Sequence, residues 1–590
     1  MTSPRARHRI AASALAAALA LAGCSGLPTT GPVSVGNAPG DAVDDTTTVR
    51  YAADEPRPGW SPAEIVDGFL KASISPEQNW ATAREFLEGD LAETWDPAAG
   101  ITIDATDDRD IPGLEQDPAE EGEEEPEETP DDDAEGGTET ATLTAQVHTR
   151  ATVDADGRYR SADEGSSTAL SFELARDEAG EWRITSAPDG IVLDSAYFLE
   201  LYSPHDLYYF DATWTALVPD SRWFPNLQNA ATRIVQELVE GAPSEWLAPA
   251  VETAFGADMQ LSRGTVPVDA DRVAAVEITG AAGADDETLS RMRAQLEQSL
   301  AATEVRSVQL TIDGQAADVD AAPIVSTRIN STPLVMTDDG FGHLAGGELS
   351  PIAGLSGILV DFPEEIRSIS LSPQEDVAVL GLEDGSVWRV TEESPDEVQV
   401  GARSVAPALD RFGFAWTVRP GDPASLTAWD ADLTPIPLSG GWADVSAVKA
   451  VDISRDGSRI AALVTIGGQE WAVVSAIERD FDGTPLSVGA PVRLAQLRLS
   501  GIDLAWIDDG TIGIAAGGSA SAQLISQPIG APQTTATAPL GVVAIAAGNQ
   551  DTTVRMLTNG GDLVVLRGGT NPTTSASGVE VLATQIGLPD

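Results

Sequence analysis

The sequence predicts a multi-domain chain: an N-terminal α+β domain, a small α/β domain and a C-terminal all-β propeller, behind a lipid-anchor signal. Three observations support this. The only cysteine of 590 residues, Cys24, directly follows a short apolar run. Helical patterns alternate with strand patterns up to Ile329 and then stop. Beyond that point turns recur about every 42 residues, a period typical of propeller blades.

The first 23 residues are predicted to be a signal peptide. Three arginines precede the apolar run at 10–22. A membrane-spanning helix needs about 20 apolar residues, so this run suits the h-region of a signal peptide instead. Leu21-Ala22-Gly23-Cys24 resembles a bacterial lipobox, which implies cleavage between Gly23 and Cys24. Cys24 would then carry N-palmitoyl and S-diacylglycerol groups. The alternative is an ordinary secretory signal with an incidental cysteine.

The charge of the chain limits its partners. The sequence has 34 basic and 93 acidic residues, a formal net charge of −59, and only two lysines. Binding to a nucleic-acid backbone needs clustered Lys and Arg, so we expect no nucleic acid as a partner. An anionic membrane surface would also repel the acidic folded part of the chain. We therefore expect lipid on Cys24 to hold it at the cytoplasmic membrane, on the extracytoplasmic face. Residues 24–58, rich in Pro, Gly, Thr and Asp, predict a flexible tether.

The first folded domain is predicted over 59–195 as an α+β domain with a cone-like sheet. Ser61 is a candidate N-cap, and a helix is expected to begin at Pro62. A second helix is expected over 79–95. Alternating apolar and polar residues over 140–190 then predict an antiparallel sheet that closes on the two helices.

An acidic insertion interrupts this domain at about 104–139. It holds 18 acidic residues against one basic residue, Arg109. Such a segment repels itself and has little to bury, so we expect a disordered loop. Calcium capture is the alternative, although a calcium site needs a fixed loop geometry.

The second domain is predicted over 196–328. A helical pattern over 229–241 ends at a glycine, a strand follows at 272–279, and a second helical pattern covers 286–303. A further strand at 305–314 completes a small α/β unit.

The third domain is predicted over 329–590 as a β-propeller of five to seven blades. The recurring turns centre near residues 339, 374, 412, 456, 509 and 550. In one of them Asp456-Gly457 would form the tight turn between two strands, and Ile460 to Leu463 would be a strand buried between blades. A β-sandwich with coincidental spacing is the alternative.

Recognisable catalytic motifs are missing from the sequence. His148, His205 and His343 fall in three different segments, so a histidine-rich zinc site is not expected. There is no HExxH, GxSxG or Walker A motif. Paired carboxylates of a glycosidase remain open, because acidic residues are abundant. We predict a protein that is not an enzyme and has no catalytic, cofactor or metal site.

Several segments together resemble the actinobacterial LpqB lipoprotein family. In the first half they are "EIVDGFLKAS", "AREFLEGDLAETWDP", "GEWRITSAPDGIVL", "LVPDSRWFP" and "ATRIVQELVEGAPSEWLAPAVETAF". In the propeller they are "PALDRFGFAWTV", "DISRDGSRIAALV", "IERDFDGTP" and "DLAWIDDGTIGI". The middle domain is similar to GerMN, a module of sporulation and cell-envelope proteins. The acidic insertion departs from the family pattern.

The resemblance implies a partner and a role. LpqB-type lipoproteins act beside the MtrA–MtrB two-component system, so the expected partner is the extracytoplasmic domain of an MtrB-like sensor histidine kinase. Modulating that kinase would influence cell-envelope homeostasis and cell division. The alternative is a non-enzymatic envelope scaffold that binds wall polymer or another envelope protein, as TolB-like propellers do.

Overall fold

The computed structural model describes residues 53–105, 109–114, 139–226, 230–281, 283–398, 403–567 and 571–587. The predicted signal peptide, the lipid-attachment residue Cys24, the tether up to residue 52 and the acidic segment 115–138 lie outside the described residues.

The first helix, α2 (Pro62–Ala72), begins where the sequence predicts. The Ser61 side chain accepts a hydrogen bond from the Glu64 amide, and the Glu64 carboxylate accepts one from the Ser61 amide at 2.7 Å. This capping box satisfies two amides that the helix leaves free. The hydrogen bonds from Ser61 also lower the pKa of Glu64. The buried face of α2, which includes Phe69, packs on Trp95 and Phe172 in edge-to-face contacts.

The prediction of one helix over 79–95 is wrong, because two short helices occupy this stretch. They are α3 (Glu77–Arg84) and α4 (Asp90–Thr94). Gly89 separates them with a φ of 53°, a left-handed conformation that does not continue a right-handed helix. The apolar residues of this stretch still face the core, since Trp80, Ala83 and Leu87 are all buried.

Two four-stranded sheets complete the first domain, where one was expected. The antiparallel sheet has the order β2-β3-β6-β7, and the mixed sheet has the order β5-β4-β1-β8, with β1 and β8 parallel. The predicted alternating stretch from residue 140 is divided between the sheets at Thr149. The strands are β1 (Gly100–Asp104), β2 (Arg109–Asp110), β3 (Thr140–His148), β4 (Ala151–Asp154), β5 (Tyr159–Ser161), β6 (Ser167–Arg176), β7 (Trp182–Ser186) and β8 (Ile191–Asp194).

The disordered loop was predicted to begin at about residue 104, but Asp104 is part of the folded domain. Asp104 is the last residue of β1 and is fully buried. Arg109, in β2, donates two hydrogen bonds to its carboxylate, from Nε at 2.5 Å and Nη2 at 3.0 Å. A buried carboxylate needs such a partner, and here the only basic residue of the acidic stretch supplies it. β2 also pairs with β3.

α5 (Ser195–Leu201), whose Phe198 is buried in the core of the first domain, leads into a hairpin that was not predicted from the sequence. The hairpin strands are β9 (Tyr202–Asp211) and β10 (Leu217–Pro225), and β11 (Val251–Glu252) adds to β9. Its two ends are buried in different places. Tyr202 and Trp223 belong to the core of the first domain, whereas Leu207 and Val218 belong to the core of the second.

The rest of the second domain follows the sequence prediction. α6 (Ala230–Glu240) and α7 (Asp286–Leu300) pack on the sheet β12-β13-β14-β15, in which α7 connects the parallel pair β13 and β14. Met292, Leu296 and Leu300 of α7 are fully buried. The strands are β12 (Gln260–Leu261), β13 (Val273–Thr279), β14 (Ser307–Ile312) and β15 (Gln315–Ala316).

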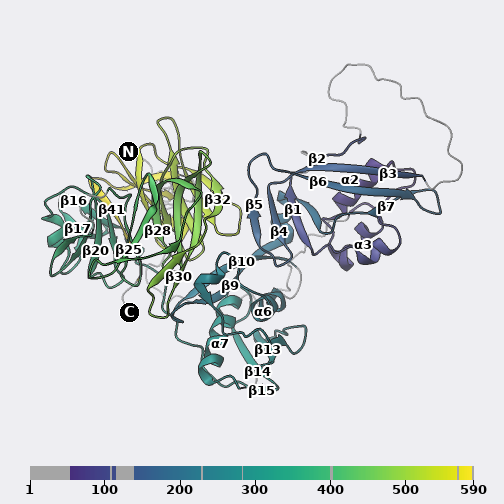
Figure 1. The fold of residues 1–590 in the computed structure, drawn as a ribbon, viewed down its shortest axis with the longest axis horizontal. Helices are drawn as coiled ribbons and strands as arrows, with labels where there is room; N and C mark the ends of the chain where they lie inside the picture. The colour runs from purple at the N-terminus through teal and green to yellow at the C-terminus, as the bar shows by residue number, and fades with distance from the viewer. Residues whose placement is uncertain are drawn as a thin grey trace, which may run out of the picture. The chain divides into compact units, whose positions relative to one another are not determined.

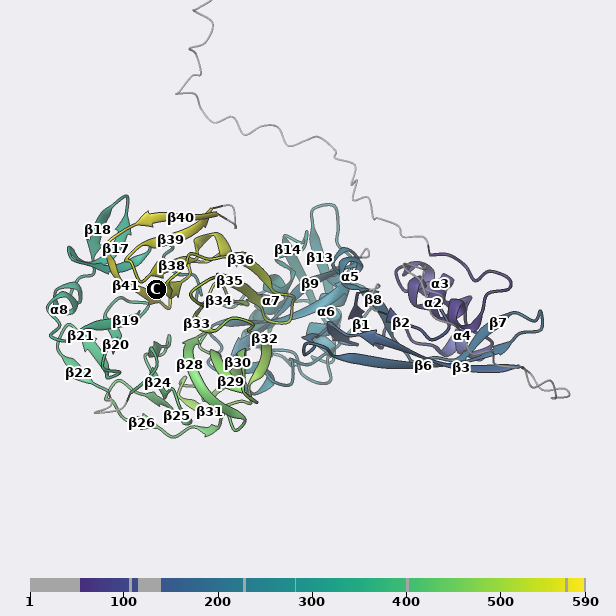
Figure 2. The same ribbon diagram turned by 90° about the horizontal axis from the view of Figure 1, so that it is seen from above.

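The third domain is a propeller of six blades, so the β-sandwich alternative is excluded (Figures 1 and 2). Strands β22, β26 and β40 lie at the rim of the ring in Figure 2, and β19, β28 and β33 lie towards its centre. The first three blades contain β16 (Leu334–Thr337), β17 (Gly340–Ala345), β18 (Glu348–Pro351); β19 (Ile366–Leu371), β20 (Val377–Leu382), β21 (Val387–Thr391), β22 (Pro395–Glu397); and β23 (Ala408–Leu409), β24 (Ala415–Arg419), β25 (Asp422–Trp429), β26 (Pro435–Ile436). A short helix, α8 (Ser356–Val360), precedes the second blade.

The last three blades follow the same plan, with one enlargement. In the fourth blade the long strand β30 pairs with both β31 and β32, and β27 adds to β31, which explains the longest interval between the predicted turns. The strands are β27 (Ser439–Gly440), β28 (Val445–Ile453), β29 (Arg459–Ile466), β30 (Gln469–Arg479), β31 (Pro485–Val488), β32 (Val492–Gln496); β33 (Gly501–Trp506), β34 (Thr511–Gly517), β35 (Ala522–Pro528), β36 (Thr534–Thr537); and β37 (Val542–Ala546), β38 (Arg555–Thr558), β39 (Leu563–Arg567), β40 (Asn571–Ala576).

Both ends of the propeller sequence meet in one blade. The C-terminal strand β41 (Val579–Gln585) pairs antiparallel with β16 and contributes the inner strand of the first blade. Five of the six predicted turns therefore connect the first and second strands of a blade, while the turn near 339 connects the second and third. Gly457 has a φ of 79° in its turn, and Ile460 to Leu463 are buried as predicted.

Candidate functional site

The histidines that the sequence analysis singled out do not come together. His205 stacks on Phe224, and burial lowers its pKa. His343 Nε2 lies 2.9 Å from Glu375 Oε1, while His148 lies at the end of β3. Among the described residues, no group of three His, Cys, Asp or Glu side chains is arranged to hold a metal ion. In the same part of the chain, no helix has the length and hydropathy of a membrane span.

The hairpin β9–β10 joins the three domains. Trp223 of β10 is buried against Phe198, with ring centroids 4.6 Å apart, and its Nε1 donates to the carbonyl of Gly530 in the propeller at 2.8 Å. At the other end of the hairpin, Arg411 of the propeller donates to Thr215 Oγ1 at 3.2 Å. One hairpin therefore contacts the cores of two domains and the loops of a third.

A second aromatic side chain strengthens this junction. Trp246, from the loop after α6, packs against the core of the second domain and against a core cluster of the fourth and fifth blades. Beside it, the Asp220–Arg222 ion pair of β10 is almost fully buried and also binds Ser244. A buried pair with its hydrogen bonds satisfied holds this loop in one position.

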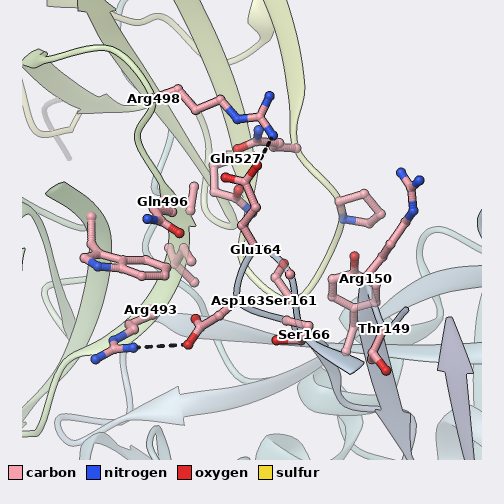
Figure 3. A pocket seen from close by; sticks show the side chains of 18 of the residues that line it. Thr149, Arg150, Ser161, Asp163, Glu164, Ser166, Arg493, Gln496, Arg498 and Gln527 are labelled. Carbon is pink, nitrogen blue, oxygen red and sulfur yellow. Dashed lines mark hydrogen bonds and ion pairs between the residues drawn. The ribbon is translucent and has the colours of Figure 1, made fainter. Parts of the chain in front are cut away.

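A pocket of about 820 Å³ lies beside the junction, where the first domain faces the propeller (Figure 3). On one side are the end of β3, the strand β5 and the loop 162–166 that follows it. On the other side are β32, β35 and the loop after β35. Its volume is in the range of about 300–1,000 Å³ that is usual for ligand sites.

Two arginine–carboxylate pairs cross this pocket, and Figure 3 shows both. Arg493 Nη1 lies 3.6 Å from Asp163 Oδ2, and Arg498 Nη2 lies 3.0 Å from Glu164 Oε1. All four side chains keep a large exposed surface, from 45% for Arg493 to 81% for Arg498. Exposed pairs of this kind contribute about 0–1 kcal/mol each, so another anion can replace the carboxylates at little cost.

Trp471 holds one of these arginines in place. The guanidinium carbon of Arg493 lies 4.8 Å from the centroid of the Trp471 ring. Trp471 itself is buried and lies on β30, next to β32. A cation–π contact of this type restricts the arginine while leaving its N–H groups free to donate.

Amide side chains form much of the propeller wall. Gln523 and Gln527 lie four residues apart on β35 and so share one face of that strand. Gln527 Nε2 donates to the carbonyl groups of Pro528 and Ala531 at 2.7 and 3.1 Å. These bonds orient the amide, and its oxygen accepts no hydrogen bond from the described residues. Gln496 and Gln533 also line the pocket.

A smaller pocket of about 370 Å³ shares part of this lining and extends it towards the second domain. Arg158 and Arg160 lie in its wall. Together the two pockets are lined by five arginines (Arg150, Arg158, Arg160, Arg493 and Arg498) and four carboxylates (Asp163, Glu164, Asp220 and Glu245). The whole chain, by contrast, has 34 basic and 93 acidic residues. Arginine is therefore locally concentrated in a strongly acidic protein.

Of the residues that line the larger pocket, only His148 was singled out from the sequence, as one of three dispersed histidines. The arginines and amides of the pocket come from several strands and loops, and none belongs to a motif with fixed spacing. The one available signal was the scarcity of basic residues, because 158–160 and 493–498 each bring two arginines close together in the sequence.

Three family models match the chain, in the order of its domains. The N-terminal domain of lipoprotein LpqB matches residues 55–199, a sporulation and spore germination domain matches 206–318, and the LpqB β-propeller domain matches 339–580. None of the three descriptions names an enzymatic activity.

Several proteins with similar sequences are named lipoprotein LpqB. Lipoprotein LpqB of Thermobifida fusca is 32% identical over 53% of this chain and 48% of its own length, so that match spans about half of the relative. Lipoprotein LpqB of Streptomyces coelicolor is 27% identical over 80% of each chain. A solved structure assigned to TolB of Agrobacterium tumefaciens aligns with 38% of this chain and 87% of its own, at 13% identity and a TM-score of 0.28.

The fold and the matched domains define a class of lipoprotein in which a GerMN-type domain connects an α+β domain to a β-propeller. The chain belongs to the LpqB lipoprotein family.

Proposed function

We propose that this protein is a lipid-anchored extracytoplasmic lipoprotein that binds the extracytoplasmic domain of an MtrB-like sensor histidine kinase and modulates its signalling. Through that kinase it would influence cell-envelope homeostasis and cell division. The observation that carries the proposal is the junction around the β9–β10 hairpin. It connects three domains through Trp223, Trp246 and Arg411, and so presents their loops as one binding surface.

Loops on such a scaffold are where binding residues concentrate. The family relationship supports the anchor, since the relatives are named lipoproteins, and Cys24 follows the lipobox-like residues Leu21-Ala22-Gly23. The resemblance to LpqB supplies the kinase as the expected partner.

The anchor is tested by Cys24→Ala, with Ser25→Ala as the control. We expect the Cys24 variant to fold normally and to leave the membrane fraction, because the acidic body has no other attraction to a membrane. The control variant should stay membrane-bound. Retention of Cys24→Ala in the membrane fraction after a high-salt wash would contradict lipid attachment at this residue.

The partner is tested by titrating the purified full-length protein with the kinase's extracytoplasmic domain, beside a signalling reporter in cells. Shortening the tether 24–58 by 20 residues should weaken the reporter response and leave the affinity in solution unchanged, because only the reach of the tether changes. Absence of binding in solution would overturn the kinase proposal.

A second candidate function is an envelope scaffold that binds wall polymer or another envelope protein. The polar pocket beside the junction favours it, because its amide, hydroxyl and arginine side chains are suited to a hydrophilic ligand. Pull-down from cells would separate the two candidates by recovering either the kinase or wall fragments.

A further inference from the structure

We propose that the 820 Å³ pocket between loop 162–166 and the β32–β35 wall is a binding site for a short anionic oligosaccharide, one that carries carboxylate or phosphate groups. The proposal rests on the extracytoplasmic location proposed above, and it does not require that the kinase be the partner.

The amides of the propeller wall favour a ligand rich in hydroxyl groups. A glutamine side chain offers two N–H donors and a carbonyl acceptor, which matches a sugar hydroxyl that both donates and accepts. Gln523 presents these groups from β35. On the same face Gln527, whose amide nitrogen already donates to Pro528 and Ala531, presents its carbonyl oxygen. On the opposite side, Thr149, Ser161 and Ser166 add hydroxyl groups.

The arginines favour a negative charge on that ligand. Arg493 and Arg498 approach the pocket from β32 and the residues just after it (Figure 3). A guanidinium group binds a carboxylate or a phosphate through two parallel N–H donors. Arg493 already lies against Trp471, so it loses little conformational freedom when a ligand binds.

The ligand would take the places that Asp163 and Glu164 now occupy. Both carboxylates are more than 60% exposed, so they return to water with little loss of solvation. The exchange gives up two weak, exposed ion pairs, and the ligand gains paired N–H contacts with the same two arginines.

Other ligand classes fit the pocket less well. Protein interfaces have an apolar, aromatic core, whereas most of the residues in this lining carry amide, hydroxyl or charged side chains, with Tyr159 and Trp471 as the aromatic members. A long polyanion such as a nucleic acid would be repelled by the net charge of −59. A short charged saccharide contacts only the pocket, where arginines outnumber carboxylates.

The test is calorimetric titration of the full-length protein in detergent with three oligosaccharides of matched length: oligogalacturonate, a phosphorylated malto-oligosaccharide and a neutral malto-oligosaccharide. We expect at least one charged oligomer to bind at least tenfold more tightly than the neutral one. Comparing the two charged oligomers then identifies the anion as carboxylate or phosphate.

Variants assign the binding to the pocket. Arg493→Gln with Arg498→Gln should weaken the charged oligomer at least tenfold. Arg263→Gln, at another exposed arginine, which is paired with Glu277 in the second domain, should have no effect. Gln523→Ala should weaken binding several-fold, and Gln315→Ala, on an exposed edge strand, should not. The melting temperature of each variant shows whether it folds.

Three outcomes would overturn the proposal: no binding of any oligomer, equal binding of charged and neutral oligomers, or full binding by the folded double-arginine variant. Binding of the kinase domain is measured with the same variants. If the double variant loses the kinase domain and no oligomer binds to the native protein, the pocket is a protein interface. That result would reject the saccharide and leave the kinase proposal intact.

Discussion

Arginine–carboxylate pairs differ sharply between the interior of the propeller and the pocket beside it. In the interior, Arg479 is 3% exposed and donates to Asp410 Oδ2 and to the carbonyl groups of Gly457 and Gly483, each at 2.7 Å. At the pocket, Arg498 meets Glu164 through one exposed contact. The same chemistry joins adjacent blades in the first case and makes a replaceable contact in the second.

Burial explains the difference. Asp410 is fully buried and also accepts hydrogen bonds from Phe412, Phe414 and Trp416, so its charge is compensated on all sides. An ion pair that is exposed to water contributes little stabilising free energy, because solvent competes for both partners. Burial makes an ion pair costly to break, and exposure makes it easy to exchange.

The largest effect is expected when the buried pair is broken. Arg479→Met would leave the Asp410 carboxylate buried without its cation, which costs about 3–5 kcal/mol. We expect the free energy of unfolding in urea to fall by that amount. Arg263→Met, at an exposed pair, is the control and should change it by less than about 1 kcal/mol.

Adding Asp410→Asn to Arg479→Met sharpens this comparison, because the double variant no longer buries an unpaired charge. It should lose less stability than the two single losses added together. Equal effects of Arg479→Met and Arg263→Met would contradict the distinction between the two environments.

A half-buried carboxylate that forms no ion pair with an arginine should respond to pH. Asp452 Oδ2 accepts the Trp506 amide of the next blade at 3.2 Å, as Asp503 accepts Ile545 at 2.9 Å. Burial, helped by the charge of Asp503, raises the pKa of Asp452 to about 7. Asp456 differs: burial opposes its ionisation, but the charge of Arg459 and hydrogen bonds lower its pKa.

The raised pKa means that the folded protein holds the Asp452 proton more tightly than the unfolded chain does. This contribution is fully present below the unfolded pKa of about 4 and is lost as pH rises through 7. Asp452 keeps some exposed surface, so we expect about 1–2 kcal/mol less stability at pH 8 than at pH 5 from this group. In Asp452→Asn that part of the pH dependence should disappear from urea denaturation curves; an unchanged profile would contradict the assignment.

The smallest effect is expected at the pocket. Arg498→Gln should lower the free energy of unfolding by less than about 1 kcal/mol, because its partner is already solvated. Adding 0.5 M NaCl screens this exposed pair, and because the pair contributes little, the loss should change the melting temperature of the native protein only slightly. A loss above 2 kcal/mol would show that the exposed pair holds the domains together as strongly as the buried one holds the blades.

Local patterns predicted much of the fold, and their failures have physical causes. The N-cap at Ser61, the helical pattern of α7 and the turn at Asp456-Gly457 depend on neighbours within a few residues, and all three were found as predicted. The helix over 79–95 failed because the apolar spacing continues across Gly89 although the backbone does not.

Long-range pairing produced the other differences. The hairpin β9–β10 was not predicted, because its two ends are buried in different cores, so neither strand shows a simple alternation. Asp104 was placed in the acidic insertion because only the folded chain buries it beside Arg109.

The sequence by itself determined the order of the domains, the propeller and its repeated turns, and the lipobox-like signal at Cys24, because each depends on spacing along the chain. Only the tertiary structure decided the number of blades, their closure by β41 and the junction at Trp223. The pocket is also a tertiary feature. Arg498 and Glu164 are 334 residues apart in the sequence, and they meet only because the first domain packs against the propeller.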